Sequence, residues 1–352
     1  MRNRFPSETR RPTIEDVARL AGVSKGTVSK FINGGDYYVA KETQARIAAA
    51  VAELEFQPNA IARDLVRRRT NTVGVIVANI ANPLYPEIIA AVSEELDASD
   101  FTVLFGSSDG SAAKEADLVR SMRQRQVDGI IIASVRMDST EVARLVGADV
   151  DVVLVSRNLR EEGLVSSVIV DNQGGAGRAV RHLVEHGHAR IAHIAGPQDV
   201  VPFADRREAY QRECLDAGVD VDPSLLIVAR QSSHEAGAEA VNALLDLPSP
   251  PTAVFVGSDT MAMGVLEACD RRRVSVPRDL AVVSFDNVWV GRMPGVQLTS
   301  VDSRSREIGR LAAKRLVARI EARWRGDDVP PAATLTLPTD LVVRRTCGCV
   351  PG

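Results

Sequence analysis

Residues 13–33 read TIEDVARLAGVSKGTVSKFIN, and this stretch decides how the N-terminal part of the chain folds. Thr13 and Asp16 have the spacing of a capping box, which predicts a helix that begins after Thr13. Apolar residues at positions 14, 17, 18 and 21 then recur at the spacing of one buried helical face. Gly22 breaks this helix, and Ser24 is a good N-cap for a second one. The stretch therefore predicts two short helices joined by a tight turn.

The second of these helices has two unlike faces. Val28 and Ile32 share the face that we expect to pack inward. The opposite face is small, polar and basic, and it carries Gly26, Ser29, Lys30 and Asn33, with Lys25 at its leading end. Such a face is expected of a helix that enters a DNA major groove. A purely structural helical hairpin with an exposed polar face is the alternative.

The spacing of the whole stretch follows a recurring pattern, T-x-x-D-V-A-x-x-A-G-V-S-x-x-T-V-S-x-x-x-N. The chain keeps Asp16, Val17, Ala18, Ala21, Gly22, Val23, Ser24, Thr27, Val28, Ser29 and Asn33. This pattern resembles the DNA-binding headpiece of the lactose/galactose-repressor family of bacterial transcription factors. The resemblance implies DNA contacts from Thr13, Ser24, Lys25, Gly26, Thr27, Ser29, Lys30 and Asn33.

The composition is that of a globular protein with an uneven charge distribution. The 352 residues are 45% hydrophobic and 25% charged, which is enough for two or three domains with a large core. The net charge is -3, but residues 1–70 carry 13 Lys and Arg against 8 Asp and Glu, and the remainder carries 30 against 38. A basic headpiece on an acidic body is typical of a DNA-binding protein that carries a sensor.

Cysteine usage and hydropathy point to a reducing cytosol. A chain of this length with four cysteines is not a disulfide scaffold. No apolar run reaches the ~18 residues of a membrane span, and residues 1–11 form a basic arm rather than a signal peptide. We therefore expect a cytoplasmic, nucleoid-associated protein with no membrane partner. Cys347-Gly-Cys349 could be metal-binding or redox-active, but no second ligand pair lies near it in the sequence, so a loose tail with free thiols is favoured.

A third helix and a hinge follow the second helix. The third helix is expected at residues 41–54, with Ala40 where the family usually has a Ser cap, and it completes a headpiece over 12–57. Residues 58–71 form a hinge and linker, in which Ala60 to Leu65 is too short to be a stable helix alone. The resemblance implies a hinge helix that contacts the DNA minor groove through Asn59, Ala62, Arg63 and Leu65. By the same resemblance Leu65 is the apolar wedge that kinks the duplex; a linker helix with Leu65 tucked into the protein is the alternative.

From residue 72 the chain alternates between short apolar runs and helical stretches. Buried parallel strands are expected at residues 73–77, 102–105, 129–133 and 152–155, and further strands at 168–170, 191–194, 225–228, 253–256 and 281–285. Helices are expected at 86–99, 112–124, 174–186, 204–217, 234–245 and 260–271. Repeated βα units predict an α/β fold with two doubly wound sheets.

This body resembles the type I periplasmic-binding-protein-like sensor of the same family, and the resemblance covers roughly residues 12–347. It is carried by stretches such as Asn82-Pro83-Leu84-Tyr85, Val127-Asp128-Gly129-Ile130, Ser258-Asp259 and Phe285-Asp286-Asn287. The resemblance implies an effector-binding and dimerisation domain at 72–347, whose chain crosses between two subdomains three times. The N-subdomain is expected at about 72–168 and 300–330, and the C-subdomain at about 170–298 and 331–345.

Ligands of open α/β sheets bind beyond the carboxyl ends of the strands, which here places an effector in the cleft between the subdomains. The expected effector-binding residues are Asn82, Leu84, Tyr85, Ser156, Arg157, Arg206, Ser258, Asp259, Asp286 and Trp289. Two Arg and two Asp among them suit a small polyhydroxylated ligand. An Arg can donate two hydrogen bonds to vicinal hydroxyls, and an Asp can accept hydrogen bonds from hydroxyls. Two alternatives stay open: Arg206 and Asp286 could merely bridge the two halves, and Trp289 could be a buried packing residue.

Two further chemistries are not expected. His182, His186 and His188 form H-x-x-x-H-G-H, but no acidic or cysteine ligand adjoins them in the sequence, so we expect no metal and no cofactor. The chain has no P-loop, no G-x-G-x-x-G after a strand and no G-x-S-x-G, so we expect no enzyme.

The sequence therefore predicts a ligand-responsive repressor that binds a near-palindromic operator in double-stranded DNA. A homodimer is preferred because the leucine heptad that makes tetramers in the lactose-repressor branch is missing from the C-terminus. The effector is expected to be a sugar or a sugar derivative. A regulator that depends on a nucleoside or purine-type co-repressor is the alternative, followed by a solute-binding protein with the same sensor fold.

Overall fold

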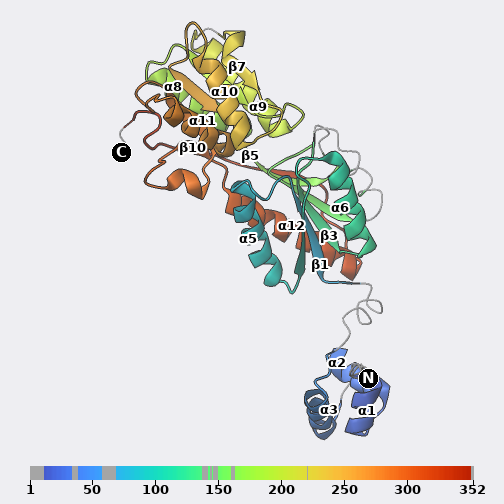
Figure 1. Cartoon of the computed structure of the whole chain (residues 1–352). Coiled ribbons are helices and arrows are strands. Elements are labelled where there is room, and N and C mark those ends of the chain that lie inside the picture. The colour runs from blue at the N-terminus through green and yellow to red at the C-terminus, as the bar shows by residue number, and fades with distance from the viewer. Residues whose placement is uncertain are drawn as a thin grey trace, which may run out of the picture. The chain divides into compact units, whose positions relative to one another are not determined.

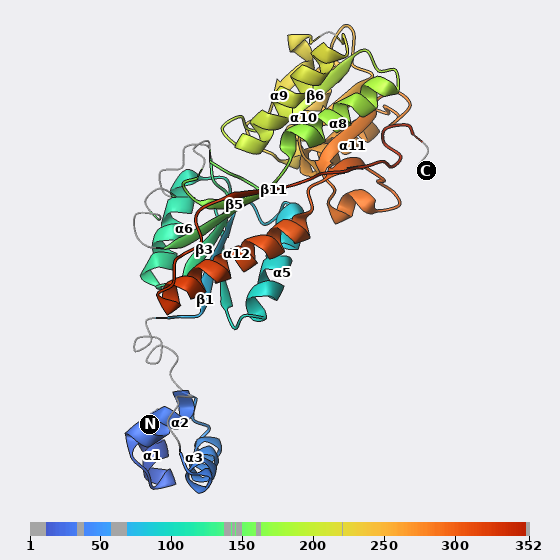
Figure 2. The same ribbon diagram turned by 180° about the vertical axis from the view of Figure 1, so that it is seen from behind.

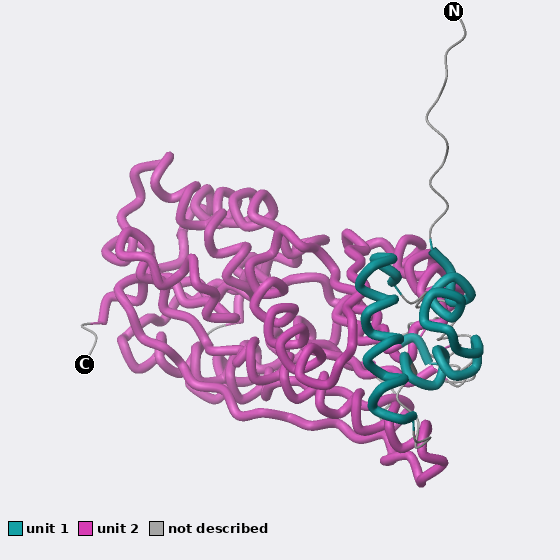
Figure 3. Tube along the Cα trace, turned by 90° about the horizontal axis from the view of Figure 1, so that it is seen from below, with its two compact units in different colours: residues 1–70 teal, residues 71–352 magenta. Residues whose placement is uncertain are grey.

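The computed structural model describes residues 12–33, 39–57, 69–136, 142, 145, 150–159, 163–219 and 221–349. The chain divides into two compact units, residues 1–70 and residues 71–352, which are coloured separately in Figure 3. This division falls close to the expected end of the hinge.

In its described residues, the first unit is a cluster of three helices, α1 (Ile14–Ala21), α2 (Lys25–Asn33) and α3 (Lys41–Glu53). The capping box is confirmed, because the Thr13 backbone N–H donates to the Asp16 carboxylate at 2.9 Å and the Thr13 hydroxyl accepts from the Asp16 N–H. Gly22 ends α1 with a φ of 62°, a left-handed conformation that glycine adopts without strain. Val17, Val28 and Ile47 are fully buried between the helices.

The start of α3 confirms the missing cap. Its N-cap residue is Ala40, which makes no side-chain capping hydrogen bond. The Gln44 side chain instead donates to the Val39 carbonyl at 2.9 Å, which ties the first turn to the preceding residue. A side chain from within the helix thus ties the first turn of α3 to Val39.

The second unit holds two sheets, drawn in Figures 1 and 2. Within the described residues, the first sheet has the strand order β11-β5-β4-β3-β1-β2, and all its pairs are parallel. Its strands are β1 (Thr72–Val77), β2 (Thr102–Ser107), β3 (Gly129–Ala133), β4 (Asp151–Val155), β5 (Ser166–Val170) and β11 (Thr334–Leu337). Helices α5 (Leu84–Asp97) and α12 (Ser305–Arg325) cover one face, and α6 (Ala112–Gln124) covers the other. We call this half the N-lobe.

The second sheet has the strand order β12-β10-β9-β8-β6-β7, with only β12 antiparallel among the described strands. Its strands are β6 (Ile191–Ala195), β7 (Leu226–Val228), β8 (Ala253–Val256), β9 (Ala281–Asp286), β10 (Thr299–Asp302) and β12 (Leu341–Val342). The flanking helices are α8 (Asn172–Glu185), α9 (Val201–Asp216), α10 (His234–Leu245) and α11 (Asp259–Arg271), with short 3-10 turns η1 (Pro223–Leu225) and η2 (Trp289–Arg292). We call this half the C-lobe.

Helix pairs in both lobes approach closely at glycines. A Cβ atom on Gly309 of α12 would lie 2.6 Å from the Ile88 carbonyl oxygen of α5. A Cβ atom on Gly264 of α11 would lie 1.8 Å from the His234 carbonyl oxygen of α10. Since interiors are packed without room for such an atom, these glycines set the distance between the helices.

The predicted α/β fold with two doubly wound sheets is confirmed, and the strand order requires the expected three crossings between lobes. The expected subdomain boundaries are wrong at two crossings. Residues 299–302 form β10, which pairs with β9 of the C-lobe, and residues 334–337 form β11, which pairs with β5 of the N-lobe. The second crossing thus follows β10, and the third follows β11. The sequence of β11 does not indicate which lobe it belongs to, because it is an edge strand whose residues are mostly exposed.

Two other expectations need correction. Strand β2 is an edge strand whose residues 102–105 are exposed or half-buried, so the expectation of a buried strand there is wrong. The C-terminal tail is also not loose as far as Cys349. The Thr346 hydroxyl donates to the Val282 carbonyl at 2.7 Å, and the Thr346 carbonyl accepts from the Val282 N–H at the same distance. Cys347 is buried beside these contacts.

Candidate functional site

The candidate DNA-binding face is the outer side of α2. Val28 is fully buried, while Ser24, Lys25, Gly26 and Lys30 are exposed. The Ser24 side chain accepts from the Thr27 N–H at 3.1 Å, as expected of the N-cap. Thr27 and Ser29 are half-buried, and Asn33 is the last residue of the helix. Lys25, Gly26 and Lys30 of α2 are thus exposed, whereas Val28 packs inward.

Lys25 has a partner that the sequence reasoning missed. Its Nζ atom lies 2.9 Å from the Glu15 carboxylate of α1, and both side chains are more than half exposed. Exposed pairs of this kind contribute little stability, so a phosphate group can replace Glu15 at small cost. Lys25 is therefore held at the leading end of α2, where its charge is accessible.

The hinge contacts expected from Asn59, Ala62, Arg63 and Leu65 lie outside the described residues. They stay predictions.

The candidate effector site centres on Arg206, which projects from α9 and is 5% exposed. Its Nε donates to the Asn172 side chain at 3.0 Å, and its Nη1 donates to the Gly257 carbonyl at 2.6 Å. The Arg206 Nη1 atom lies 3.7 Å from Oδ1 of Asp286, which is 4% exposed at the end of β9. At 3.7 Å the pair is held by charge rather than by a short hydrogen bond, so the Asp286 oxygens keep accepting capacity.

Aromatic rings hold the Arg206 guanidinium in place. Its Cζ atom lies 3.6 Å from the ring centroid of Phe285 and 5.4 Å from that of Phe203. A cation over an aromatic face is attracted to the ring, and the planar fork is thereby fixed for hydrogen bonding. Sequence reasoning missed both rings and Asn172. For two of them the sequence contained a signal, because Phe285 directly precedes Asp286 and Asn172 follows the end of β5.

Burial shifts the ionisation of this pair. It raises the pKa of the Asp286 carboxyl to about 7, although the Arg206 guanidinium lowers it. Burial lowers the pKa of Arg206, while Asp286 and, from the N-lobe, Tyr85 raise it. Burying two charged groups without full hydrogen bonding destabilises the folded protein. Ionisable groups in such surroundings are typical of binding sites. Because both residues belong to the C-lobe, the alternative that they bridge the two halves is wrong.

Asp259, at the start of α11, is satisfied within the C-lobe. Its carboxylate accepts from the Ser300 hydroxyl at 2.7 Å, from the Val288 N–H at 2.8 Å and from the Ser284 hydroxyl. Burial raises its pKa to about 6, against the hydrogen bonds from the two serines. These contacts favour a supporting role, in which Asp259 fixes the backbone that follows Asp286.

The N-lobe supplies a second group of predicted residues. Arg157 donates to the Tyr85 hydroxyl at 3.2 Å and to the Ser134 carbonyl at 3.0 Å. Asn82 is buried and accepts from the Leu84 N–H at 3.0 Å, which shapes the start of α5. Tyr85 also raises the pKa of Arg206 of the C-lobe by electrostatic attraction.

The remaining predicted effector residues differ in their surroundings. Ser156 follows β4 with a φ of 61°, a strained conformation of the kind stored at functional sites. Ser258 caps α11 and its hydroxyl lies 2.7 Å from that of Ser232. Trp289 is 53% exposed, so the alternative of a buried packing residue is wrong.

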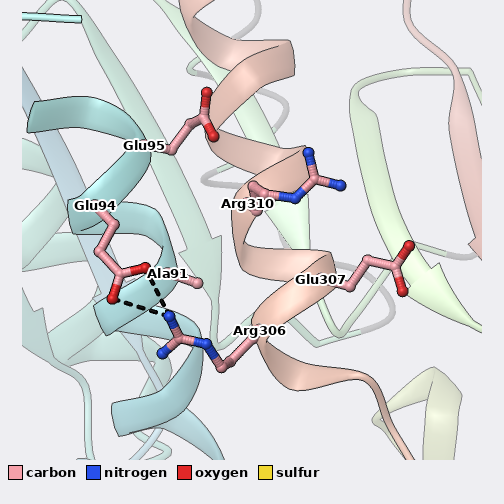
Figure 4. Close-up of a pocket in the computed structure, with 6 residues that line it drawn as sticks. All are labelled: Ala91, Glu94, Glu95, Arg306, Glu307 and Arg310. Carbon is pink, nitrogen blue, oxygen red and sulfur yellow. Dashed lines mark hydrogen bonds and ion pairs between the residues drawn. The ribbon is translucent and has the colours of Figure 1, made fainter. Parts of the chain in front are cut away.

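A surface pocket of about 440 Å³ lies elsewhere on the N-lobe, between α5 and α12 (Figure 4). Its lining is Ala91, Glu94, Glu95, Arg306, Glu307 and Arg310. Arg306 of α12 donates to both carboxylate oxygens of Glu94 of α5, at 2.6 and 2.9 Å. These two charges in the pocket lining therefore pair with each other across the two helices. None of the predicted effector residues lines it.

An ion pair links the two lobes. The Arg136 guanidinium, which follows β3 of the N-lobe, pairs with the Asp199 carboxylate, which follows β6 of the C-lobe. Both side chains are more than two-fifths exposed. The pair connects the segments that follow two strands, where the candidate effector residues also lie.

No described helix is long and apolar enough to cross a membrane.

Comparisons with known proteins match both units. Residues 13–59 match the family model described as bacterial regulatory proteins, lacI family, and residues 180–347 match a periplasmic binding protein-like domain. The HTH-type transcriptional regulator CelR of Thermobifida fusca is 37% identical over 96% of this chain and 98% of its own length.

Solved structures agree with this match. A transcriptional regulator CelR–cellobiose complex is 34% identical, with a TM-score of 0.71 over 96% of this chain and all of that one. The lac repressor dimer bound to operator and the anti-inducer ONPF is 25% identical, with a TM-score of 0.81 over 96% of this chain and 99% of that one. An N-terminal helix-turn-helix, two doubly wound lobes and an identity of 37% across nearly the whole length lead to one conclusion: the chain belongs to the lacI family of bacterial transcriptional regulators.

Proposed function

We propose that the protein is a ligand-responsive repressor that binds a near-palindromic operator as a homodimer and is controlled by a small polyhydroxylated effector, a sugar or a sugar derivative. The buried Arg206–Asp286 pair carries the effector part of this proposal. The exposed basic face of α2 carries the DNA part.

The chemistry of the pair supports a hydroxylated ligand. A guanidinium fork donates to two vicinal oxygens, and a carboxylate accepts from hydroxyls. Asn172 and the Gly257 carbonyl hold Arg206 from one side, and the rings of Phe285 and Phe203 fix its plane. Pre-set polar groups of this kind provide orientation and specificity in small-molecule sites. The relative solved with cellobiose is a sugar-binding regulator, which supports the same class of effector here.

The mechanism is a coupling free energy between cleft and headpiece. An effector that contacts Arg206 in the C-lobe and Tyr85 in the N-lobe stabilises one closure of the lobes. In a homodimer that closure changes the separation of two headpieces, each with one recognition helix. A two-fold axis then requires an operator with two related half-sites.

The alternatives differ in measurable ways. A nucleoside or purine-type co-repressor would strengthen operator binding, whereas an inducing sugar weakens it; the exposed ring of Trp289 is the group that could stack on a base. A solute-binding protein would need no DNA-binding headpiece. We assign no catalytic role to the cleft, and we place the protein in the cytoplasm, where its operator lies.

The test has two stages, both with the full chain. Thermal unfolding is measured against a panel of sugars, sugar phosphates and nucleosides, where a ligand at 100 times its Kd contributes about 2.7 kcal/mol. Operator sites are then selected from random duplexes, and binding is titrated with and without the stabilising ligand. We expect a change of about 5–150-fold in operator affinity. A ligand that binds without changing operator affinity would contradict the proposed coupling, and the absence of any selected site would contradict the repressor assignment.

A further inference from the structure

The structure brings together metal-ligating side chains that are far apart in the sequence. His182 and His186 lie at the end of α8, and Cys349 follows β12. The Cys349 Sγ atom lies 3.3 Å from Nε2 of His182. The potential ligand atoms of His182, His186 and Cys349 all lie within 4.8 Å of one another. The cysteine that the histidine pair lacked in the sequence is thus supplied by the C-terminal tail.

The two histidines are oriented on one side of the helix. Residues four apart face the same side, and the two imidazole centroids are 4.3 Å apart. Nδ1 of His186 lies 2.6 Å from the His182 carbonyl oxygen. Because a carbonyl oxygen only accepts, Nδ1 of His186 carries the hydrogen, and Nε2 keeps its lone pair. Such a bond from the second ring nitrogen to a carbonyl is the usual way in which a metal-binding histidine is oriented.

The cysteine is held beside the helix by the fold of the tail. Thr346 bonds to Val282 of β9, and the Thr299 hydroxyl donates to the Cys347 thiol at 3.1 Å. Gly348 has a φ of 86°, and its N–H donates to the Arg345 carbonyl, so the chain turns before Cys349. Cys349 is half-buried and His186 is exposed, which leaves the cluster open to an ion from solvent.

The donor set identifies the class of ion. A thiolate and two imidazoles suit zinc, whereas magnesium and calcium require oxygen ligands. His188, two residues after His186, is not in the cluster, because its Nδ1 atom contacts the Thr252 hydroxyl at 3.0 Å.

We propose that His182, His186 and Cys349 form a zinc-binding site, which clamps the C-terminal tail to the end of α8. The site lies outside the candidate effector residues, and it does not depend on the identity of the effector. A bound ion closes a link between α8 and the tail that follows β12, so it stabilises the folded C-lobe.

The experiment uses the full chain, free of affinity tags and treated with a chelator. Zn²⁺ is titrated by calorimetry, and Co²⁺ is used as a spectroscopic probe. We expect one ion per chain, a thiolate-to-cobalt charge-transfer band in the near ultraviolet and a higher Tm with Zn²⁺. His186→Gln and Cys349→Ser should each weaken zinc binding by more than the about 10–100-fold that loss of an outer-shell partner costs. Cys349→Ser should also abolish the charge-transfer band.

Matched controls are available in the same lobe. His188→Gln removes a neighbouring imidazole, and Cys269→Ser removes a buried thiol of α11. Both should bind zinc like the wild type. The proposal is overturned if the wild type binds no more zinc than Cys349→Ser, if the cobalt complex lacks the thiolate band, or if His188→Gln loses as much affinity as His186→Gln. His186 is exposed, so its variant tests the site without disturbing the core.

Discussion

Arg206 and Asp286 face each other at 3.7 Å with 6% and 3% of their side chains exposed, and both belong to the C-lobe. The fold therefore buries an acid–base pair in one lobe without bringing the two groups into short hydrogen-bond contact. A structural ion pair of this depth needs nearly ideal geometry to offset its desolvation. The arrangement fits two groups that are available for hydrogen bonds with the hydroxyls of a ligand.

The pH dependence of stability follows from the buried acids. Burial raises the folded-state pKa of Asp286 to about 7 and that of Asp259 to about 6, from an ordinary value of 3.8. The folded protein therefore binds more protons than the unfolded chain between about pH 4 and 7. The stability that the folded state gains from these raised pKa values is fully present below pH 4 and is lost as the pH rises through 7. Urea unfolding of wild type and Asp286→Asn across pH 5–8 should show a smaller loss in the variant; equal slopes would mean that Asp286 ionises normally.

Lys30 should read a base edge. It is exposed near the middle of α2, on the side opposite Val28. Lys30→Ala should cost about 1–3 kcal/mol on the selected operator and relax the preference at one base position. Anisotropy titrations on operator and random DNA provide the measurement, with Lys114→Ala in the N-lobe as the control. The same loss on both duplexes would make Lys30 a phosphate contact.

The hinge prediction concerns Leu65. If its side chain wedges into the minor groove of the operator, Leu65→Ala loses the apolar contact that offsets unstacking, which costs a few kcal/mol per step. Specific binding should weaken strongly, while salt-sensitive binding to random DNA stays nearly the same. The variant is compared with Leu335→Ala, which alters an exposed leucine of β11. Wild-type affinity for the operator in Leu65→Ala would leave Leu65 as an ordinary linker residue.

The ion pair between the lobes should favour closure. Asp199→Asn removes the partner of Arg136, and exposed pairs are worth about 0–1 kcal/mol. Effector affinity should therefore fall by no more than about fivefold, as 1 kcal/mol corresponds to that factor. Asp246→Asn breaks an exposed pair with Arg272 inside the C-lobe and should leave effector affinity unchanged. Tighter effector binding by Asp199→Asn would show that the pair stabilises an open arrangement.

Local signals in the sequence predicted much of the fold. The capping box at Thr13 and the buried strand at residues 129–133 depend on neighbours in the chain, and both are confirmed. Strand β11 was assigned to the wrong lobe, because pairing partners of an exposed edge strand leave no local pattern.

The sites show the same limit. Arg206 and Asp286 were predicted as site residues from their places near strand and helix ends, and the structure places them together. The contact between Cys349 and His182 joins residues from the tail and from α8, which only the tertiary fold brings together. Each half alone lacked enough ligands to indicate a metal site.

The most direct test of the central claim is an operator titration of the wild type and Asp286→Asn, with and without the effector found by thermal shift. Hydrogen bonds to charged groups contribute about 1.5–3 kcal/mol, so the variant should lose at least about tenfold in effector affinity. The account predicts that wild-type operator affinity changes about 5–150-fold with effector. It predicts that Asp286→Asn needs at least about tenfold more effector for the same change in operator affinity, and that without effector it binds the operator like the wild type. A full wild-type response in Asp286→Asn would contradict the account and move the effector site away from the Arg206–Asp286 pair.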